Sequence, residues 1–392
     1  MPAELHIRKR VLTLLVLLIF LFGVLVCRIA YLTTARSAEL TSRGVRQWTR
    51  EGTVYARRGN ILDTNGQTLV MSATAYIVSV EPGKVQDVQA FARAISPILG
   101  LSEEKVAEKA SQRGKSSVTL KRQVSRETAD QLRQLKQSKD AETAAAASAL
   151  LFDEDVRRVY LRGAFLTQTL GLVNVDGVGQ SGLEQQYETL LRGEAGRSMR
   201  SVDGKARPIY DSGNLYIEPQ DGSTIRLTID ATIQEIVEKA MRECYEVNKA
   251  QAVHALVMDV YTGAVLAMCS KPDYDPNDPP REQLDALQSL MRIRLISDSY
   301  EPGSTFKILT DAAALDSGVT TPEDDFYCSG KIKVDGDTIK CWGSPHKAET
   351  MAQALQNSCN PVFVELALRM GAQRFYQYLH AFGLGSKTNI DL

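Results

Sequence analysis

One uncharged apolar run near the N-terminus limits most strongly what this chain can fold into. Residues 11–27 carry no charge and are rich in Leu, Val, Ile and Phe, and Ile29–Tyr31 lengthen the run to about the twenty residues that cross a bilayer as a helix. A cleaved signal peptide would have small residues of the A-x-A kind after its apolar core, and none follow. A lipoprotein signal would need a small residue before Cys27, where Val26 stands. We therefore predict an uncleaved membrane anchor at residues 11–32.

Charge around the anchor does not decide its orientation. Arg8, Lys9 and Arg10 precede it, but several arginines soon follow it. The numbers of basic residues on the two sides of the anchor are therefore similar, and the positive-inside rule does not choose between them. A long C-terminal portion is translocated largely regardless of its charge. We therefore expect residues 1–10 in the cytoplasm and, after a solvated stalk at residues 33–51, the remainder outside the plasma membrane.

The composition narrows the classes of function. The chain has 46 Lys and Arg against 47 Asp and Glu, a formal net charge of −1, which excludes a globally basic nucleic-acid binder and an acidic disordered tail. Its six cysteines and four histidines include no CxxC pair, so a zinc site of the usual spacing is not expected. No metal and no cofactor are predicted.

Residues 52–215 are typical of a mixed α+β module without an obvious catalytic cluster. Short β-branched runs flank Asn65-Gly66, the kind of dipeptide that most favours a hairpin turn. Ser102 precedes two acidic residues, which predicts a helix that this serine caps. Residues 152–181 show no sustained periodicity in the spacing of their apolar residues. Further helices are expected at Thr128–Leu135, Ala144–Leu151 and Leu183–Leu191.

Residues 216–392 are expected to form a second module in which helices pack against a sheet. Ser223–Ile229 alternates like a strand, and Asp230 or Thr232 can cap a following helix. That helix and the next two strands are expected at Ile233–Glu246, Ala252–Val260 and Ala264–Cys269. The predicted fold class is therefore mixed α/β, with one transmembrane helix, an extended α+β module and a domain of helices packed on an antiparallel sheet.

A serine and a lysine three residues apart supply the first candidate for chemistry. Ser304 follows Pro302-Gly303 and opens an apolar run of helical spacing, with Lys307 over the same face. A hydroxyl needs a base to become a nucleophile, and a lysine whose pKa is lowered by burial can be that base. The same S-x-x-K spacing occurs at Ser102 and Ser344, and the alternative role for each serine is a helix cap.

A second polar turn lies 54 residues after Ser304. Ser358 and Asn360 stand between two predicted helices, Ala348–Leu355 and Val362–Leu368. Such a turn can direct a hydroxyl and an amide into one cleft, although both residue types also cap helices. Ser212-Gly213-Asn214 repeats the pattern. The order and spacing of the two motifs, rather than either motif alone, favour a catalytic site.

The ordered set of segments resembles the class B penicillin-binding proteins, which are monofunctional transpeptidases. Residues 56–66, A-R-R-G-N-I-L-D-T-N-G, are similar to the family's R-G-x-I-x-D-R-N-G segment, with Thr64 in place of the usual arginine. Gly182-Leu183-Glu184 and Tyr187 resemble its G-L-E-x-x-Y segment. Leu227–Asp230 resembles the start of its transpeptidase domain.

The resemblance covers nearly all of residues 11–392 and assigns a role to each module. Residues 52–215 correspond to the family's dimerisation or pedestal domain, and residues 216–392 correspond to its penicillin-binding transpeptidase domain. What the resemblance implies is an enzyme of peptidoglycan synthesis that cross-links stem peptides through a serine acyl-enzyme. The implied partners are the stem peptides, β-lactams and a membrane glycosyltransferase of the SEDS type.

The family's motifs carry their roles over to four residues of this chain. Ser304 would attack the penultimate D-Ala carbonyl of a stem peptide, and Lys307 would be the base for that acylation. Ser358 and Asn360 would relay protons and hold amide groups of the substrate, although the division of base duties is disputed in related enzymes. β-Lactams would acylate the same serine.

One motif of the family has no counterpart in the sequence. Lys387-Thr388-Asn389 is similar to Lys-Thr/Ser-Gly, but its neighbours match an upstream loop of the family and not the active-site strand. We therefore expect a transpeptidase domain that is incomplete at its C-terminus, and the activity of this chain by itself stays open. The alternative function is a non-catalytic, membrane-anchored scaffold of the machinery that synthesises the cell wall.

Two cysteines flank a predicted hairpin. Residues 331–340 alternate about Asp335-Gly336, which is typical of a two-residue turn. The hairpin would bring Cys328 and Cys341 within reach of a disulfide, and we predict this bond on the oxidising side of the membrane, with two buried free thiols as the alternative. Together with Ser-Cys-Asn-Pro, these cysteines resemble the sporulation-type or elongation-type branch of the family.

Overall fold

The apolar N-terminal run forms a helix, as predicted. In the computed structural model, which describes residues 2–138, 140–201 and 215–392, helix α1 spans Pro2–Thr34. Its segment Val11–Thr34 is long and apolar enough to cross a membrane and has no buried portion. These properties are compatible with a membrane anchor.

The predicted stalk is largely helical. Helix α2 spans Ser37–Trp48, and strand β1 follows at once as Thr49–Val54. This strand pairs with β6 (Gly196–Ser201), which in turn pairs with β7 (Leu215–Ile217). Residues 49–51 therefore belong to a sheet rather than to the stalk, because their backbone pairs with a strand that is distant in sequence.

The contacts between residues separate the chain into two compact units, and the boundary in the sequence lies between Ile293 and Arg294. The first unit is built on a five-stranded sheet whose longest strand is β3 (Thr68–Val80). One edge of β3 pairs along its length with β5, in antiparallel register from Val70↔Tyr160 to Val80↔Leu150. The remaining strands are β2 (Ile61–Leu62), β4 (Val118–Val124), β5 (Leu150–Tyr160) and β8 (Ile225–Arg226).

The predicted hairpin at Asn65-Gly66 is confirmed. Strands β2 and β3 are antiparallel, and Gly66 adopts a φ of +83° in the turn between them. The Asp63 carboxylate accepts hydrogen bonds from the backbone N–H groups of Asn65 and Gln67 at 2.9 and 2.7 Å. A side chain that bonds to its own turn in this way stabilises the reversal of the chain.

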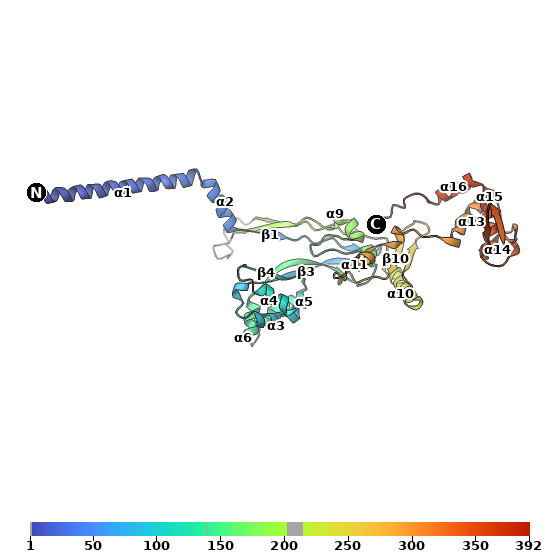
Figure 1. Ribbon diagram of the computed structural model, residues 1–392, viewed down its shortest axis with the longest axis horizontal. Helices are drawn as coiled ribbons and strands as arrows, with labels where there is room; N and C mark the ends of the chain where they lie inside the picture. Colours follow the sequence, from blue (N-terminus) through green and yellow to red (C-terminus); the bar gives the residue numbers. More distant parts are fainter. Residues whose placement is uncertain (1, 139, 202–214) are drawn as a thin grey trace. The chain divides into compact units, whose positions relative to one another are not determined.

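Short helices gather beside strands β3 and β4 and cover their core face (Figure 1). Ser102 caps one of them, as predicted, and its hydroxyl accepts from the Lys105 N–H at 3.4 Å. Phe91, Ile95 and Leu132 are fully buried in the resulting core. The helices and short 3₁₀ turns of this layer are η1 (Pro82–Lys84), α3 (Val88–Leu99), α4 (Glu103–Ala110), α5 (Arg126–Gln134), η2 (Leu135–Gln137) and α6 (Ala141–Ser148).

Strand β5 differs from the prediction. A helix was predicted over 144–151 and no regular element over 152–160, whereas α6 ends at Ser148 and β5 begins at Leu150. Asp155 and Arg158 of this strand are buried. Buried charged residues break the alternation of apolar and polar residues by which a strand is recognised.

One of these two residues, Arg158, belongs to a buried ion-pair network. Glu184, which is fully buried, lies 2.5 Å from Arg58 Nε and 2.7 Å from Arg158 Nε through its two carboxylate oxygens. Arg158 also donates to the backbone carbonyl of Gly59 at 2.8 Å. The two segments that carried the family resemblance in this module, at 56–66 and 182–187, therefore meet in one structural cluster.

The rest of the first unit places a long helix against a hairpin. Asp230 caps α10 (Ala231–Asn248), as predicted, and β9 (Val253–Met258) pairs with β10 (Val265–Lys271) as expected. The predicted strand at 223–229 is shorter, because only Ile225–Arg226 pairs as β8. The helix predicted at 183–191 is interrupted at Tyr187, which separates two short helices. The short helices here are α7 (Thr167–Leu170), α8 (Gly182–Gln186), α9 (Glu188–Leu191) and α11 (Leu284–Met291).

The second unit consists of helices and two small hairpin-like sheets around a core that includes Cys328, Cys359 and Leu366. Strand β11 pairs with β14, and β12 pairs with β13. The predicted hairpin is confirmed, since Asp335 and Gly336 have φ values of +50° and +93° between β12 and β13. The elements are α12 (Arg294–Ser297), η3 (Gly303–Phe306), α13 (Lys307–Asp316), β11 (Asp325–Cys328), β12 (Lys331–Val334), β13 (Asp337–Lys340), β14 (Lys347–Thr350), α14 (Met351–Gln356), α15 (Asn360–Met370) and α16 (Ala372–Ala381).

One boundary in this unit differs from the prediction. A helix was expected to begin at Ala348, but residues 347–350 pair with β11 and the helix begins at Met351. Thr350 caps it with a reciprocal capping box to Gln353.

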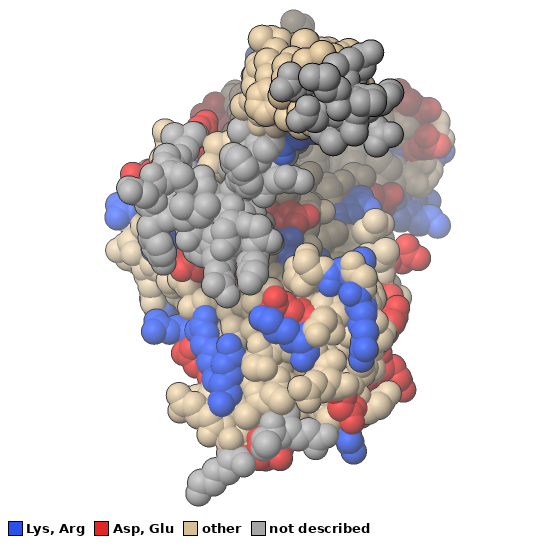
Figure 2. All heavy atoms as spheres, turned by 90° about the vertical axis from the view of Figure 1, so that its left-hand side faces the viewer, with Lys and Arg blue, Asp and Glu red and all other residues tan. Residues whose placement is uncertain are grey.

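On the face drawn in Figure 2, basic and acidic side chains are interspersed rather than gathered by sign.

Candidate active site

Ser304 lies at the start of the helix that was predicted to carry it. Gly303 has a φ of +58°, a conformation that glycine adopts at little cost, and it turns the chain into the 3₁₀ turn η3. That turn continues directly into α13 at Lys307. Ser304 is exposed, so its hydroxyl is open to a ligand from solvent.

Lys307 lies one turn further on, and its amine is surrounded by oxygen atoms. Its Nζ lies 2.7 Å from the backbone carbonyl oxygen of Ser358, 2.8 Å from Ser358 Oγ and 2.6 Å from Asn360 Oδ1. It also lies 5.6 Å from the centre of the Phe363 ring. All four residues of the predicted site, Ser304, Lys307, Ser358 and Asn360, are therefore brought together in the second unit.

The turn that carries Ser358 and Asn360 joins α14 to α15, as predicted. Ser358 has a φ of +51°, which is uncommon for a residue with a Cβ and costs of order 1–3 kcal/mol. Such a conformation persists only where its surroundings hold it. The turn therefore fixes the direction of the Ser358 hydroxyl at some cost to stability.

Three polar atoms form a chain of contacts across this site. The Ser358 hydroxyl donates to Ser304 Oγ at 2.9 Å, and the Lys307 amine donates to Ser358 Oγ at 2.8 Å. The direct distance from Lys307 Nζ to Ser304 Oγ is longer, at 3.4 Å. The shorter path between amine and nucleophile thus runs through Ser358.

Burial lowers the pKa of Lys307 below the usual lysine value, while charge on Cys341 and Cys359 would act in the opposite direction. A lowered pKa increases the fraction of neutral amine at a given pH. Only the neutral amine has a lone pair that can accept a proton. The environment of Lys307 therefore favours the form that a general base requires.

Lys340 and Trp342 also hold this turn, and neither was predicted from the sequence to do so. Asn360 Nδ2 donates to the Lys340 carbonyl oxygen at 2.9 Å, and Trp342 Nε1 donates to the Asn357 carbonyl oxygen at 2.8 Å. Both partners come from the end of strand β13. A tryptophan next to a predicted hairpin is the only signal that the sequence offered for this contact.

The other candidate motifs occupy different environments. Ser102 is a helix cap, and Ser344 lies in the loop before β14, with Lys347 at the start of that strand. Lys387-Thr388-Asn389 lies after α16 and outside any strand, as expected for a loop segment. The second match to Ser-x-Asn, at residues 212–214, lies outside the described residues.

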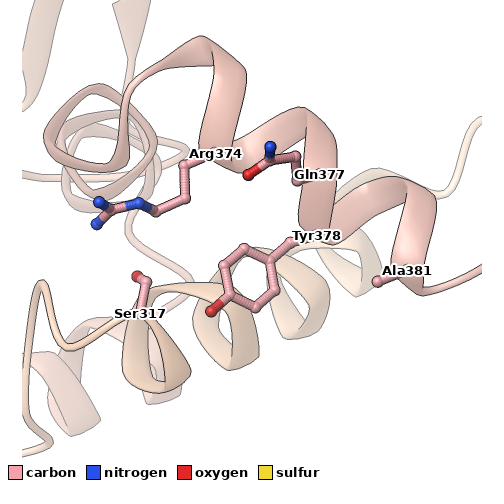
Figure 3. Close-up of a pocket in the computed structure, with 5 residues that line it drawn as sticks. All are labelled: Ser317, Arg374, Gln377, Tyr378 and Ala381. Atoms are coloured by element: carbon pink, nitrogen blue, oxygen red, sulfur yellow. The ribbon is translucent and has the colours of Figure 1, made fainter.

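A pocket in the same unit lies away from this chain of contacts. It is formed by Ser317, at the C-terminal end of α13, together with residues of α16 (Figure 3). Ten residues of helix separate Ser317 from Lys307, a distance of about 15 Å along the axis. Tyr378 Oη donates to Asp316 at 2.7 Å beside this pocket.

Comparison with protein families identifies both parts of the chain. Residues 53–227 match the penicillin-binding protein dimerisation domain, and residues 253–392 match the penicillin-binding protein transpeptidase domain. The chain belongs to the penicillin-binding proteins, in agreement with the resemblance that its sequence motifs indicated.

Among its relatives, the chain is similar to stage V sporulation protein D of Bacillus subtilis, with 34% identity over 390 residues that cover 98% of the chain and 58% of that protein. It is 29% identical to the peptidoglycan D,D-transpeptidase FtsI of Escherichia coli over 97% of the chain and 62% of FtsI. It is 28% identical to the probable peptidoglycan D,D-transpeptidase PenA of Neisseria meningitidis over 99% of the chain and 66% of PenA. The chain thus spans between about half and two thirds of the length of these relatives.

Solved structures support the fold. A peptidoglycan synthetase from Bifidobacterium adolescentis superposes with a TM-score of 0.60 at 25% identity, over 88% of this chain and 65% of that one. Penicillin-binding protein 2X from Streptococcus thermophilus gives a TM-score of 0.64 at 23% identity, over 86% of this chain and 52% of that one.

Proposed function

We propose that this protein is a peptidoglycan D,D-transpeptidase in which Ser304 forms the acyl-enzyme. The proposal rests on one observation above all, the chain of contacts from Lys307 through Ser358 to Ser304. The names of two relatives support the same reaction: FtsI is named a peptidoglycan D,D-transpeptidase, and PenA is named a probable one.

The contacts of Lys307 suit a neutral amine that accepts a proton from Ser358. A neutral amine has two N–H groups and one lone pair. The two N–H groups can donate to the Ser358 carbonyl oxygen and to Asn360 Oδ1, at 2.7 and 2.6 Å. The lone pair is then left for the Ser358 hydroxyl at 2.8 Å. With the amine neutral, both hydrogen bonds therefore reverse their direction: Ser358 donates to Lys307 Nζ, and Ser304 donates to Ser358 Oγ.

Acylation would follow from this arrangement. The Ser304 oxygen bonds to the penultimate D-Ala carbonyl carbon while its proton moves to Ser358 Oγ, and the Ser358 proton moves to Lys307 Nζ. Collapse of the tetrahedral intermediate breaks the C–N bond, and the departing D-Ala amine takes the proton back from Lys307 by the same route. The amine of a second stem peptide then attacks the ester carbonyl carbon and forms the new C–N bond of the cross-link. The C–O bond to Ser304 breaks, and the proton lost by the amine passes through Lys307 and Ser358 to the Ser304 oxygen.

The same step would trap a β-lactam. The Ser304 oxygen bonds to the lactam carbonyl and the ring C–N bond breaks, but the amine remains tethered to the acyl group. For this chemistry to reach its substrate, residues 33–392 lie outside the cytoplasm with α1 as the anchor. A membrane glycosyltransferase of the SEDS type is the proposed partner, since new glycan must be supplied at the same surface.

Labelling with a fluorescent penicillin tests the assignment. In the protein at its native length and in its membrane, we expect covalent labelling that Ser304→Ala abolishes, while Ser102→Ala and Ser344→Ala retain it. Peptide mapping of the adduct supplies an independent readout. An adduct on any serine other than Ser304 would refute the assignment, and absence of any adduct would favour a non-catalytic scaffold.

A further inference from the structure

Four metal-ligating side chains meet in the second unit, although the sequence shows no metal-binding motif. Cys328 ends strand β11, Cys341 follows β13, His346 precedes β14 and Cys359 precedes α15. Their sulfur and nitrogen atoms all lie within 4.8 Å of one another. The absence of closely spaced cysteine pairs predicted no zinc site, whereas these ligands come from the end of β11, from the loop between β13 and β14, which holds both Cys341 and His346, and from the turn before α15.

The spacing of the four atoms fits a tetrahedral ion. Zinc binds cysteine sulfur at about 2.3 Å and histidine nitrogen at about 2.0–2.1 Å in tetrahedral sites, so a sulfur and a nitrogen on one ion are about 3.6 Å apart. Cys341 Sγ and His346 Nδ1 lie 3.6 Å apart. Three cysteines and one histidine are also one of the ligand sets that structural zinc sites use.

Burial makes this cluster different from a chance group on the surface. Cys328 and Cys359 have no exposed area, and Cys341 and His346 are partly buried. All three cysteines are free thiols, so the disulfide predicted between Cys328 and Cys341 is not formed in the structure. A disulfide would account for two of them and would leave the third cysteine and the histidine unexplained.

A buried carboxylate beside the cluster points independently to a cation. Glu349 is 4% exposed, and its Oε1 atom has no hydrogen-bond partner among the described residues. This oxygen lies 3.8 Å from His346 Nδ1, while the other carboxylate oxygen accepts from Asn357 Nδ2 at 3.0 Å. A buried carboxylate next to three thiols is unfavourable unless positive charge is present nearby.

We propose that Cys328, Cys341, His346 and Cys359 bind one zinc ion, with Glu349 as an outer carboxylate. The ion has a structural role, because four protein ligands leave no open position for a substrate. The outer carboxylate adds negative charge around the ion.

The position of the ion explains why it would matter for the neighbouring site. Cys359 lies between Ser358 and Asn360 in the sequence, and Cys341 directly follows Lys340, whose carbonyl oxygen accepts from Asn360. The ion therefore ties the end of the β12–β13 hairpin to the turn in which Ser358 has a positive φ. The four ligands act as positioning residues for that turn.

Metal analysis of the whole chain, purified in detergent with a reductant, tests the site. We expect about one zinc per chain by elemental mass spectrometry, and Cys341→Ser or Cys359→Ser should lower the zinc content at least severalfold. Cys244→Ser and His380→Ala change the same residue types outside the cluster and should keep one zinc per chain. Glu349→Gln should weaken zinc binding by about 10- to 100-fold without abolishing it.

Cobalt substitution gives a readout that altered folding alone would not produce. Wild-type chain stripped by a chelator and loaded with Co²⁺ should show sulfur-to-cobalt charge transfer and the intense visible bands of a tetrahedral site. Cys328→Ser should weaken the charge-transfer band. Stripped wild-type chain that binds neither zinc nor cobalt would overturn the proposal, as would native protein with a Cys328–Cys341 disulfide and no zinc. These measurements need no β-lactam, so their failure is distinct from failure of the proposed transpeptidase function.

Discussion

The hydroxyl of Ser358 lies 2.9 Å from that of Ser304, although 54 residues separate them in the chain. The contact joins the start of α13 to the turn before α15 and places a second hydroxyl between the nucleophile and the amine of Lys307. A relay by Ser358 is therefore shorter at each step than direct transfer across 3.4 Å.

Removing the Ser358 hydroxyl should slow acylation of the protein by a β-lactam. We expect Ser358→Ala to lower the acylation rate constant by about 10²- to 10⁴-fold, the usual contribution of general acid–base catalysis. Stopped-flow measurement with a chromogenic β-lactam would determine it. Ser358→Gly is the matched control, because glycine accepts the positive φ without strain and also lacks the hydroxyl. Recovery of the rate in Ser358→Gly would contradict the relay and assign the loss in Ser358→Ala to the backbone.

Acylation should rise with pH through the pKa of Lys307. The active base is the neutral amine, so the rate is low below this pKa and reaches a plateau above it. Because burial lowers the pKa of Lys307, the midpoint should fall below the usual lysine value of about 10.4. The rate constant measured across this range gives the midpoint, and Lys307→Arg, which keeps a positive charge, should remove both the activity and the pH-dependent rise. A wild-type rate that is independent of pH would argue against Lys307 as the base.

Breaking the buried ion-pair network should destabilise the first unit. Glu184→Gln removes the charge that faces Arg58 and Arg158, and loss of one partner from a buried pair costs roughly 3–5 kcal/mol. Hydrogen exchange of the β3 and β5 amides measures this loss locally. Glu154→Gln, at an exposed position of β5, is the control and should leave protection unchanged. Equal protection in the two variants would show that the network does not stabilise the sheet.

Protease added to intact spheroplasts should digest the chain beyond the anchor. The expectation follows from an apolar helix that can span the membrane and from a substrate assembled on the outer face. Immunoblots with antibodies against the second unit follow the digestion, and a cytoplasmic protein serves as the control for membrane integrity. Protection of residues 33–392 until detergent is added would reverse the proposed orientation.

Sequence reasoning succeeded where neighbouring residues decide the structure. The anchor, the caps at Ser102 and Asp230 and the turns at Asn65-Gly66 and Asp335-Gly336 all depend on a few adjacent residues. It failed at β5, where the buried side chains of Asp155 and Arg158 form ion pairs with residues from other segments. No pattern within the strand itself could reveal those partners.

The amino-acid sequence by itself determined the membrane-compatible helix, the helical start that presents Ser304 and the polar turn with Ser358 and Asn360, because helix length, capping and turn chemistry are local. Only the tertiary structure decided that Lys307 contacts both residues of that turn. It also decided that Cys328, Cys341, His346 and Cys359 share one cluster. Such meetings depend on how distant segments pack into a common core, and the packing of each segment depends on all the others.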